Sequence, residues 1–193
     1  TTGLTIDTIT DNPFLHGFGF AREAEQFSLI MNYELDNGVT ITSITASNEN
    51  RWMALDDLDR RATADLGIKS VSLLNGRDLD DFSQEIRFTS PQDQRLRWMI
   101  GLSKFEFEGK RTSGFNIFGT VRSLSLGNVF DIETTGIFAA IEYDITDSLT
   151  LNVEGRHQED KVEEARSSGA EFVSGTFKST TPRIALDYSL NDD

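Results

Sequence analysis

Residues 136–156 read GIFAAIEYDITDSLTLNVEGR, and apolar and polar side chains alternate along this stretch. One set of alternate positions is apolar on both sides of a short turn: Ile137, Ala139, Ile141, Tyr143, Ile145, Leu149, Leu151 and Val153. Successive side chains of a β-strand point to opposite faces of a sheet, so the pattern predicts two antiparallel strands with one apolar and one polar face. A water-soluble sandwich and a membrane barrel can both be built from such strands.

The same alternation recurs elsewhere and predicts seven antiparallel strands in all. The other five are expected at residues 27–35, from Val39 onward, and at residues 82–89, 95–102 and 177–190. Short turns join the two members of each pair, and Pro91 is acceptable because it falls in a turn. The sequence therefore predicts a series of hairpins.

The turn Asp36-Asn37-Gly38 shows how the register is set. Leu35 and Val39 must share the apolar face, which requires an odd number of turn residues. Three residues that end in glycine fit a type I turn closed by a left-handed glycine. The sequence therefore predicts that Leu35 pairs with Val39 and Tyr33 with Ile41.

Three long segments separate the hairpins at the opposite end: residues 46–81, 104–132 and 158–176. They are polar, charged or glycine-rich, and we predict long loops for them. Short turns at one end and long loops at the other are typical of outer-membrane barrels and uncommon in compact soluble domains. The chain is thus expected to be all-β, an antiparallel up-and-down meander that forms about seven strands of the wall of a large transmembrane β-barrel.

Composition limits the possible functions. The chain has 193 residues, no cysteine and a net charge of -14. This charge argues against a nucleic-acid partner, because phosphate neutralisation needs an excess of Lys and Arg. No apolar run reaches the roughly 18 residues of a transmembrane helix. A transmembrane strand needs only about 9–11 residues with alternate ones apolar, so a mean hydropathy of -0.35 is compatible with a barrel.

Two hairpins and the last strand resemble TonB-dependent outer-membrane receptors in sequence. Residues 82–101 (FSQEIRFTSPQDQRLRWMIG) are similar to a mid-barrel hairpin of that family. Residues 140–161 (AIEYDITDSLTLNVEGRHQEDK) are similar to a later hairpin, with His157 where the family usually has tyrosine. Residues 181–188 (TPRIALDY) resemble the strand that follows.

The resemblance implies a barrel of roughly 22 strands, filled by an N-terminal plug, that imports a scarce ligand with energy delivered through TonB. Residues 1–193 would then be a partial barrel without a plug domain, TonB box or signal peptide, in the outer membrane of a Gram-negative bacterium. The implied partners are outer-membrane lipid, the plug, TonB and a small ligand. Siderophores, vitamin, saccharide and nickel complexes all use this architecture.

Charged residues of the polar face are expected to point into the barrel lumen, because a charge on the lipid face costs roughly 2–4 kcal/mol at the midplane. These residues are Glu85, Arg87, Arg95, Arg97, Glu142, Glu154 and Arg156. We expect them to pair with carboxylates of neighbouring strands or of the plug. Aromatic residues of the apolar face near the short turns are expected at the membrane interface: Phe88, Trp98, Tyr143 and Tyr188.

Ligand contacts are expected in the first long loop, where cationic and aromatic groups gather: Arg51, Trp52, Arg60 and Arg61. Acidic residues cluster at Asp56, Asp57 and Asp59 and at Asp78, Asp80 and Asp81, but the EF-hand spacing is missing, so solvated loops are expected there. His157 is expected at an aromatic-belt position, and His16 is the other histidine. No nucleophile elbow or phosphate loop is present, and we predict no enzymatic activity, cofactor or metal.

A soluble or secreted all-β binding module is the alternative that the pattern leaves open. Such a sandwich would bury the apolar face against a second sheet about 10 Å away. A barrel wall would leave the same face for lipid. The two hypotheses therefore differ in what covers the apolar face.

Overall fold

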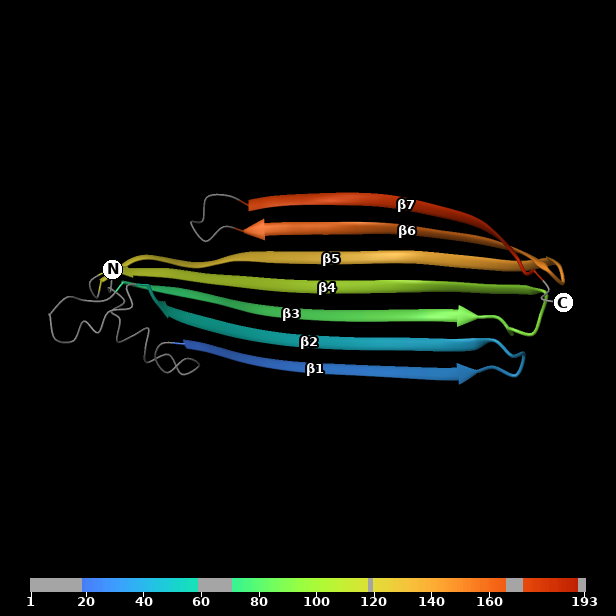
Figure 1. Ribbon diagram of the computed structural model, residues 1–193, viewed down its shortest axis with the longest axis horizontal. Helices are drawn as coiled ribbons and strands as arrows, with labels where there is room; N and C mark the ends of the chain where they lie inside the picture. Colours follow the sequence, from blue (N-terminus) through green and yellow to red (C-terminus); the bar gives the residue numbers. More distant parts are fainter. Residues whose placement is uncertain (1–18, 59–70, 118–119, 166–171, 191–193) are drawn as a thin grey trace.

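The computed structural model describes residues 19–58, 71–117, 120–165 and 172–190. They form seven β-strands: β1 (Gly19–Glu34), β2 (Thr40–Asp57), β3 (Val71–Thr89), β4 (Leu96–Ile117), β5 (Thr120–Thr146), β6 (Leu149–Ala165) and β7 (Phe172–Tyr188). All seven belong to one antiparallel sheet in the order β1-β2-β3-β4-β5-β6-β7, so each strand pairs with its sequence neighbours (Figure 1). The predicted up-and-down meander is confirmed.

Short turns join β1 to β2, β3 to β4 and β5 to β6 at one end of the sheet (Figure 1). The first turn has the predicted geometry. The Leu35 N–H donates to the Val39 carbonyl oxygen at 2.8 Å, and Gly38 has a φ of 78°. Tyr33 lies directly opposite Ile41. The predicted register of this hairpin is therefore confirmed, and it depends on a left-handed conformation that glycine adopts without steric cost.

The strands present two faces, which we name by the residues at their centre. The Ile141 face carries Trp98, Ile141, Val153 and Ile184, which lie opposite one another across four strands. The Glu142 face carries Arg97, Glu142 and Asn152 in the neighbouring row. Because facing residues of an antiparallel pair point to the same side, the register alone places these two sets on opposite sides of the sheet.

No second sheet covers the Ile141 face in the described part of the chain. Ile141 is 48% exposed, Leu186 63% and Ile184 73%. Among the described residues only Leu55 and Leu74 are buried hydrophobics, and both lie far from the short turns. No described helix is long and apolar enough to cross a membrane. The apolar face is thus left open, which disagrees with a sandwich that buries it.

The strands are much longer than the sequence pattern suggested. Residues 46–57, 71–81, 104–117, 120–132 and 158–165 lie in strands, so the prediction of long loops there was wrong. β1 also begins at Gly19 instead of residue 27, and β7 at Phe172 instead of residue 177. Polar segments form interstrand hydrogen bonds as readily as apolar ones, because every backbone N–H and C=O requires a hydrogen-bond partner whatever its side chain.

The alternation changes phase midway along β4 and β5. Near the short turns, β4 places Trp98, Ile100 and Leu102 on the Ile141 face. Farther along, Phe105 and Phe107 occupy the Glu142 face, opposite Thr134 and Ile132 of β5. Charged residues take over the Ile141 face at the same point. β4 and β5 therefore have an apolar Ile141 face in the half near the short turns and a charged one in the other half.

Candidate functional site

A charged cluster lies on the Glu142 face near the short turns. The Arg97 guanidinium donates to Asp144 at 2.6 and 2.7 Å and to Glu142 at 3.2 Å through Nε. It also donates to the Gln94 carbonyl oxygen at 2.9 Å, and Thr150 donates to Asp144 at 2.8 Å. The Arg97 side chain is only 16% exposed. These contacts bind β4, β5 and β6 together, so this cluster is already satisfied within the sheet.

The other charges predicted for the polar face share the Glu142 face by register. Arg87 pairs with Glu85 at 2.7 Å, and Arg183 of β7 with Glu154 at 3.2 Å. Arg156 instead bonds only neutral side chains, Gln158 at 3.0 Å and Ser103 at 3.4 Å. Arg95 lies just before β4, where its guanidinium is 3.4 Å from the Ile145 carbonyl oxygen. Pairing with a carboxylate of a neighbouring strand is thus found for Arg97 with Glu142 and for Glu154 with Arg183, whereas Arg87 and Glu85 pair within β3.

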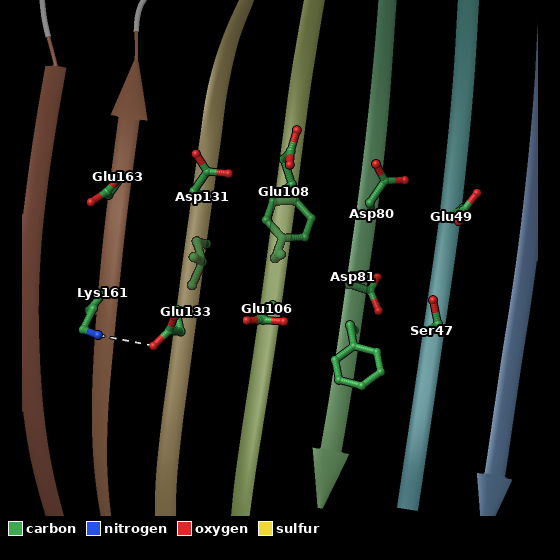
Figure 2. Close-up of a pocket in the computed structure, with 13 residues that line it drawn as sticks. Ser47, Glu49, Asp80, Asp81, Glu106, Glu108, Asp131, Glu133, Lys161 and Glu163 are labelled. Atoms are coloured by element: carbon green, nitrogen blue, oxygen red, sulfur yellow. Dashed lines mark hydrogen bonds and ion pairs between the residues drawn. The ribbon is translucent and has the colours of Figure 1, made fainter.

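The Ile141 face carries a row of carboxylates beyond its apolar half. Each member lies directly opposite the next on the adjacent strand: Glu25, Glu49, Asp80, Glu108, Asp131 and Glu163. Figure 2 shows five of these side chains at one level across β2 to β6. Nearby lysines offset part of the charge, as where Lys161 donates to Glu133 at 3.3 Å and Lys110 pairs with Glu108. Such a row requires water and counterions, because unscreened like charges that face each other repel.

Between the apolar half and this acidic row lies a transition in polarity. His157 Nδ1 and Thr180 Oγ1 are 2.7 Å apart on the Ile141 face. Two residues farther along, Lys178 pairs with Glu159 at 2.7 Å, and this hydrogen bond lowers the pKa of Glu159. Charged groups therefore begin immediately beyond His157, which matches a boundary between an apolar and an aqueous environment.

The predicted ligand residues do not converge. Arg51 and Trp52 lie in β2 and not in a loop, and they occupy opposite faces of the sheet. Arg51 Nε donates to Asp78 at 2.8 Å, which raises the pKa of Arg51, while the Trp52 ring lies 5.9 Å from that of Phe20. Arg60 and Arg61 lie outside the described residues. A ligand contact by these four residues remains a prediction.

The acidic clusters are strand residues as well. Asp78 and Asp80 share the Ile141 face, whereas Asp81 lies on the other face and accepts from Asn48 at 2.9 Å. Over the described ranges no group of three His, Cys, Asp or Glu side chains has a metal-binding arrangement. His16 and Asp59 lie outside the described residues. The expectation of solvated loops at 78–81 is therefore corrected to a solvated strand.

Sequence reasoning missed the apolar residues on the far half of the Glu142 face. They include Leu79, Phe105, Phe107, Phe130, Ile132 and Val162, which the register places on one side of β3 to β6. The signal was present, since Phe105-Glu106-Phe107-Glu108 alternates strictly. Residues 104–132 as a whole are polar, charged or glycine-rich, which favoured a loop, and the alternation at 105–108 has the phase opposite to that of Trp98 and Ile100. A strand that changes solvent along its length must change phase in this way.

The long strands, the uncovered apolar band and the charged opposite face define the wall of a transmembrane barrel. A family model of the TonB dependent receptor-like β-barrel matches residues 2–193, and the chain belongs to this family. No curated sequence matches the chain. Among solved structures it is similar to the ferric yersiniabactin uptake receptor FyuA from Yersinia pestis, with a TM-score of 0.68 and 14% identity. That match covers 90% of this chain but 27% of the receptor chain.

Proposed function

We propose that this chain forms part of the wall of an outer-membrane receptor that takes up a scarce ligand with energy from TonB. Family membership supports a receptor and not an enzyme. The change of phase along β4 and β5 carries the proposal, because it fits a strand that passes from lipid into water. The ligand is proposed to be a small molecule, and the partners to be lipid, the receptor's plug and TonB.

The apolar half of the Ile141 face has about the length of a transmembrane strand. On β5 it runs from Ile137 to Ile145, which is nine residues, and about 9–11 residues of a tilted strand span a membrane. Transmembrane barrels carry an apolar band of about 25 Å, flanked by aromatic residues. Trp98, Tyr143 and Tyr188 lie on this face near the short turns, where we predicted an aromatic belt. This arrangement supports a membrane-embedded half that ends near His157.

The far half of each strand is proposed to stand in the aqueous medium outside the cell. β5 has 27 residues, whereas about 9–11 residues span a membrane. The acidic row faces outward there, and the apolar Glu142 face encloses the entrance to the lumen. The lumen wall is consequently polar at membrane depth and more apolar above it. The soluble-module alternative does not account for this reversal, since a sandwich keeps one face apolar along the whole strand.

Cysteine labelling of the full-length receptor in cells tests this proposal. The chain contains no cysteine, so single substitutions within it give clean probes. Ile141→Cys should resist a membrane-impermeant maleimide and should react with a lipid-soluble one. Glu106→Cys, on the same face beyond the apolar band, should react with the impermeant reagent. Equal labelling of both positions in intact cells would contradict a membrane boundary between them.

A matched control uses the opposite face at the same depth. Ala140→Cys neighbours Ile141 but points to the Glu142 side. Nitroxide groups on lipid chains should quench a fluorescent label at Ile141→Cys. They should not quench the same label at Ala140→Cys. Uptake is tested separately, by comparing ligand accumulation in cells with and without TonB. Accumulation that is independent of TonB would contradict the transport part of the proposal.

A further inference from the structure

A hollow on the Glu142 face lies at the junction between the polar and apolar halves of the strands. Its lining includes Arg87, Ser103, Phe105, Thr134 and Arg156, from β3 to β6. Arg87 and Arg156 belong to one cross-strand row, with Gly101 and Phe138 between them. We call this feature the Arg87–Arg156 hollow. Two guanidinium groups therefore border it.

Two glycines beside the hollow leave room for neighbouring side chains. A side chain at Gly101 would overlap the ring of Phe138, so the ring lies across the glycine instead of standing away from the sheet. A Cβ at Gly136 would lie 3.0 Å from Ser103 Oγ and 3.2 Å from an Arg156 nitrogen. The Arg156 guanidinium carbon is 6.0 Å from the centre of the Phe138 ring. This packing holds the Arg156 cation in place over the sheet.

Arg156 has no carboxylate partner among the described residues. It bonds only the neutral oxygens of Gln158 and Ser103. Arg97 and Arg183 on the same face each contact at least one carboxylate. Arg95, which lies outside the hollow, also bonds only a neutral oxygen. The charge of Arg156 is available to a group from outside the sheet.

Arg87 supplies an independent observation. Its terminal nitrogen pairs at 2.7 Å with Glu85, which also lines the hollow. Its Nε is buried and has no hydrogen-bond partner. A buried donor without an acceptor costs roughly 1–3 kcal/mol, so such groups normally have a partner. The described sheet therefore leaves part of the donor capacity of Arg87 unused.

We propose that the Arg87–Arg156 hollow binds the oxyanion of an amphipathic organic ligand, through a carboxylate or phosphate group. The inference rests on the proposed function, because it places the ligand in the lumen. A forked guanidinium favours planar or tetrahedral oxyanions. The apolar body of the ligand would lie against Phe105 and Phe107 in the far half. Near the short turns Arg97 already contacts two carboxylates, so the anion is bound at the junction and not below it.

Binding of benzoate to the purified full-length receptor, followed by ligand-observed NMR, tests the proposal. Benzoate joins a carboxylate to an apolar ring, and benzamide is its neutral control. We expect Arg156→Gln to weaken benzoate binding about tenfold, since a charge-assisted hydrogen bond is lost. Arg183→Gln, on the same face but paired with Glu154, should leave it unchanged. Equal effects of the two substitutions, or equal binding of benzamide, would overturn the proposal.

Two further measurements keep the test decisive if Arg156→Gln fails to fold. Inorganic phosphate should displace benzoate from the unmodified receptor, and no displacement would overturn the proposal. In a crystal structure of the full receptor, a carboxylate of the receptor itself on Arg156 would also overturn it. The cysteine labelling described above is independent of anion binding. A receptor with Ile141 in lipid but no Arg156-dependent binding refutes this inference and leaves the proposed function standing.

Discussion

Gly101 of β4 and Phe138 of β5 face each other, and the aromatic ring occupies the space that a side chain at Gly101 would need. Packing of a ring over a cross-strand glycine stabilises a strand that glycine would otherwise weaken. The pair also sets the depth of the hollow between Arg87 and Arg156. The absence of a side chain at Gly101 thus lets the Phe138 ring pack over β4 on the Glu142 face.

Replacement of this glycine should destabilise the barrel. Gly101→Ala would force the Phe138 ring away from the sheet, and overpacking of this kind costs about 1–3 kcal/mol. Gly155→Ala is the matched control, because no atom lies within 4 Å of its added Cβ. It should be neutral or slightly stabilising, since glycine weakens a strand interior. Urea unfolding of the receptor in detergent micelles measures both, and a Gly101→Ala receptor as stable as Gly155→Ala would contradict the packing.

Loss of Arg97 should be the most damaging single charge change on the Glu142 face. Arg97→Met leaves Glu142 and Asp144 without their shared cation, and hydrogen bonds between charged groups are stronger than those between neutral groups. Arg183→Met removes an exposed pair with Glu154, for which about 0–1 kcal/mol is expected. Folded and unfolded barrels migrate at different positions in SDS gels. The temperature at which the folded band disappears measures the stability of each variant. Equal decreases of this temperature for Arg97→Met and Arg183→Met would contradict the clustered geometry.

The acidic row should make the receptor more stable in salt. Asp80 faces Glu49 on one side and Glu108 on the other, and like charges opposite each other destabilise a sheet by about 0.2–1 kcal/mol. Asp80→Asn should therefore stabilise the barrel at low ionic strength, and the gain should shrink in about 1 M salt, where the Debye length is about 3 Å. Asp78→Asn is the control with the opposite sign, because it removes the partner of Arg51. The unfolding temperatures of the unmodified receptor, Asp80→Asn and Asp78→Asn, measured at low and at high salt, test this prediction.

The pair between Glu159 and Lys178 should stabilise the fold only above acid pH. Lys178 holds the pKa of Glu159 below its usual value of 4.5, so the folded state favours the charged carboxylate. Its stabilisation is fully present above pH 4.5 and is lost as the pH falls through the lowered pKa. The stability difference between the unmodified receptor and Lys178→Met should accordingly vanish in acid. A difference that persists well below that pKa would show that Lys178 acts through packing.

The hairpins near the short turns were predictable because one physical constraint sets them. The face with Ile141 and Val153 must stay apolar, and a shift of one residue would move every side chain to the other side. The turn at Gly38 then fixes the register of β1 and β2. The Glu142 face followed from the same alternation. The register accordingly puts Glu85, Arg87, Arg97, Glu142, Glu154 and Arg156 on one side of the sheet, and their orientation toward a lumen stays a prediction.

The far half of the sheet could not be predicted from the same rule. Beyond Leu102 the two sides of the strand exchange environments, so Phe105 and Phe107 contradict a pattern that assumes one apolar face. Segments such as residues 46–57 also show no regular alternation of apolar and polar residues, although their backbones pair with β3. Their strand structure depends on hydrogen bonds to neighbours far away in sequence, which local propensity does not report.

The sequence by itself determined the antiparallel strands, the short turns and the two faces near them, because side-chain direction alternates along every strand. Only the tertiary structure decided which charges meet. Arg97 reaches Asp144 from 47 positions away, Arg51 and Trp52 separate to opposite faces, and Arg156 is left without a carboxylate in the described sheet. Pairing across strands depends on the register of the whole sheet, and the sheet sets this register only when all its strands are assembled.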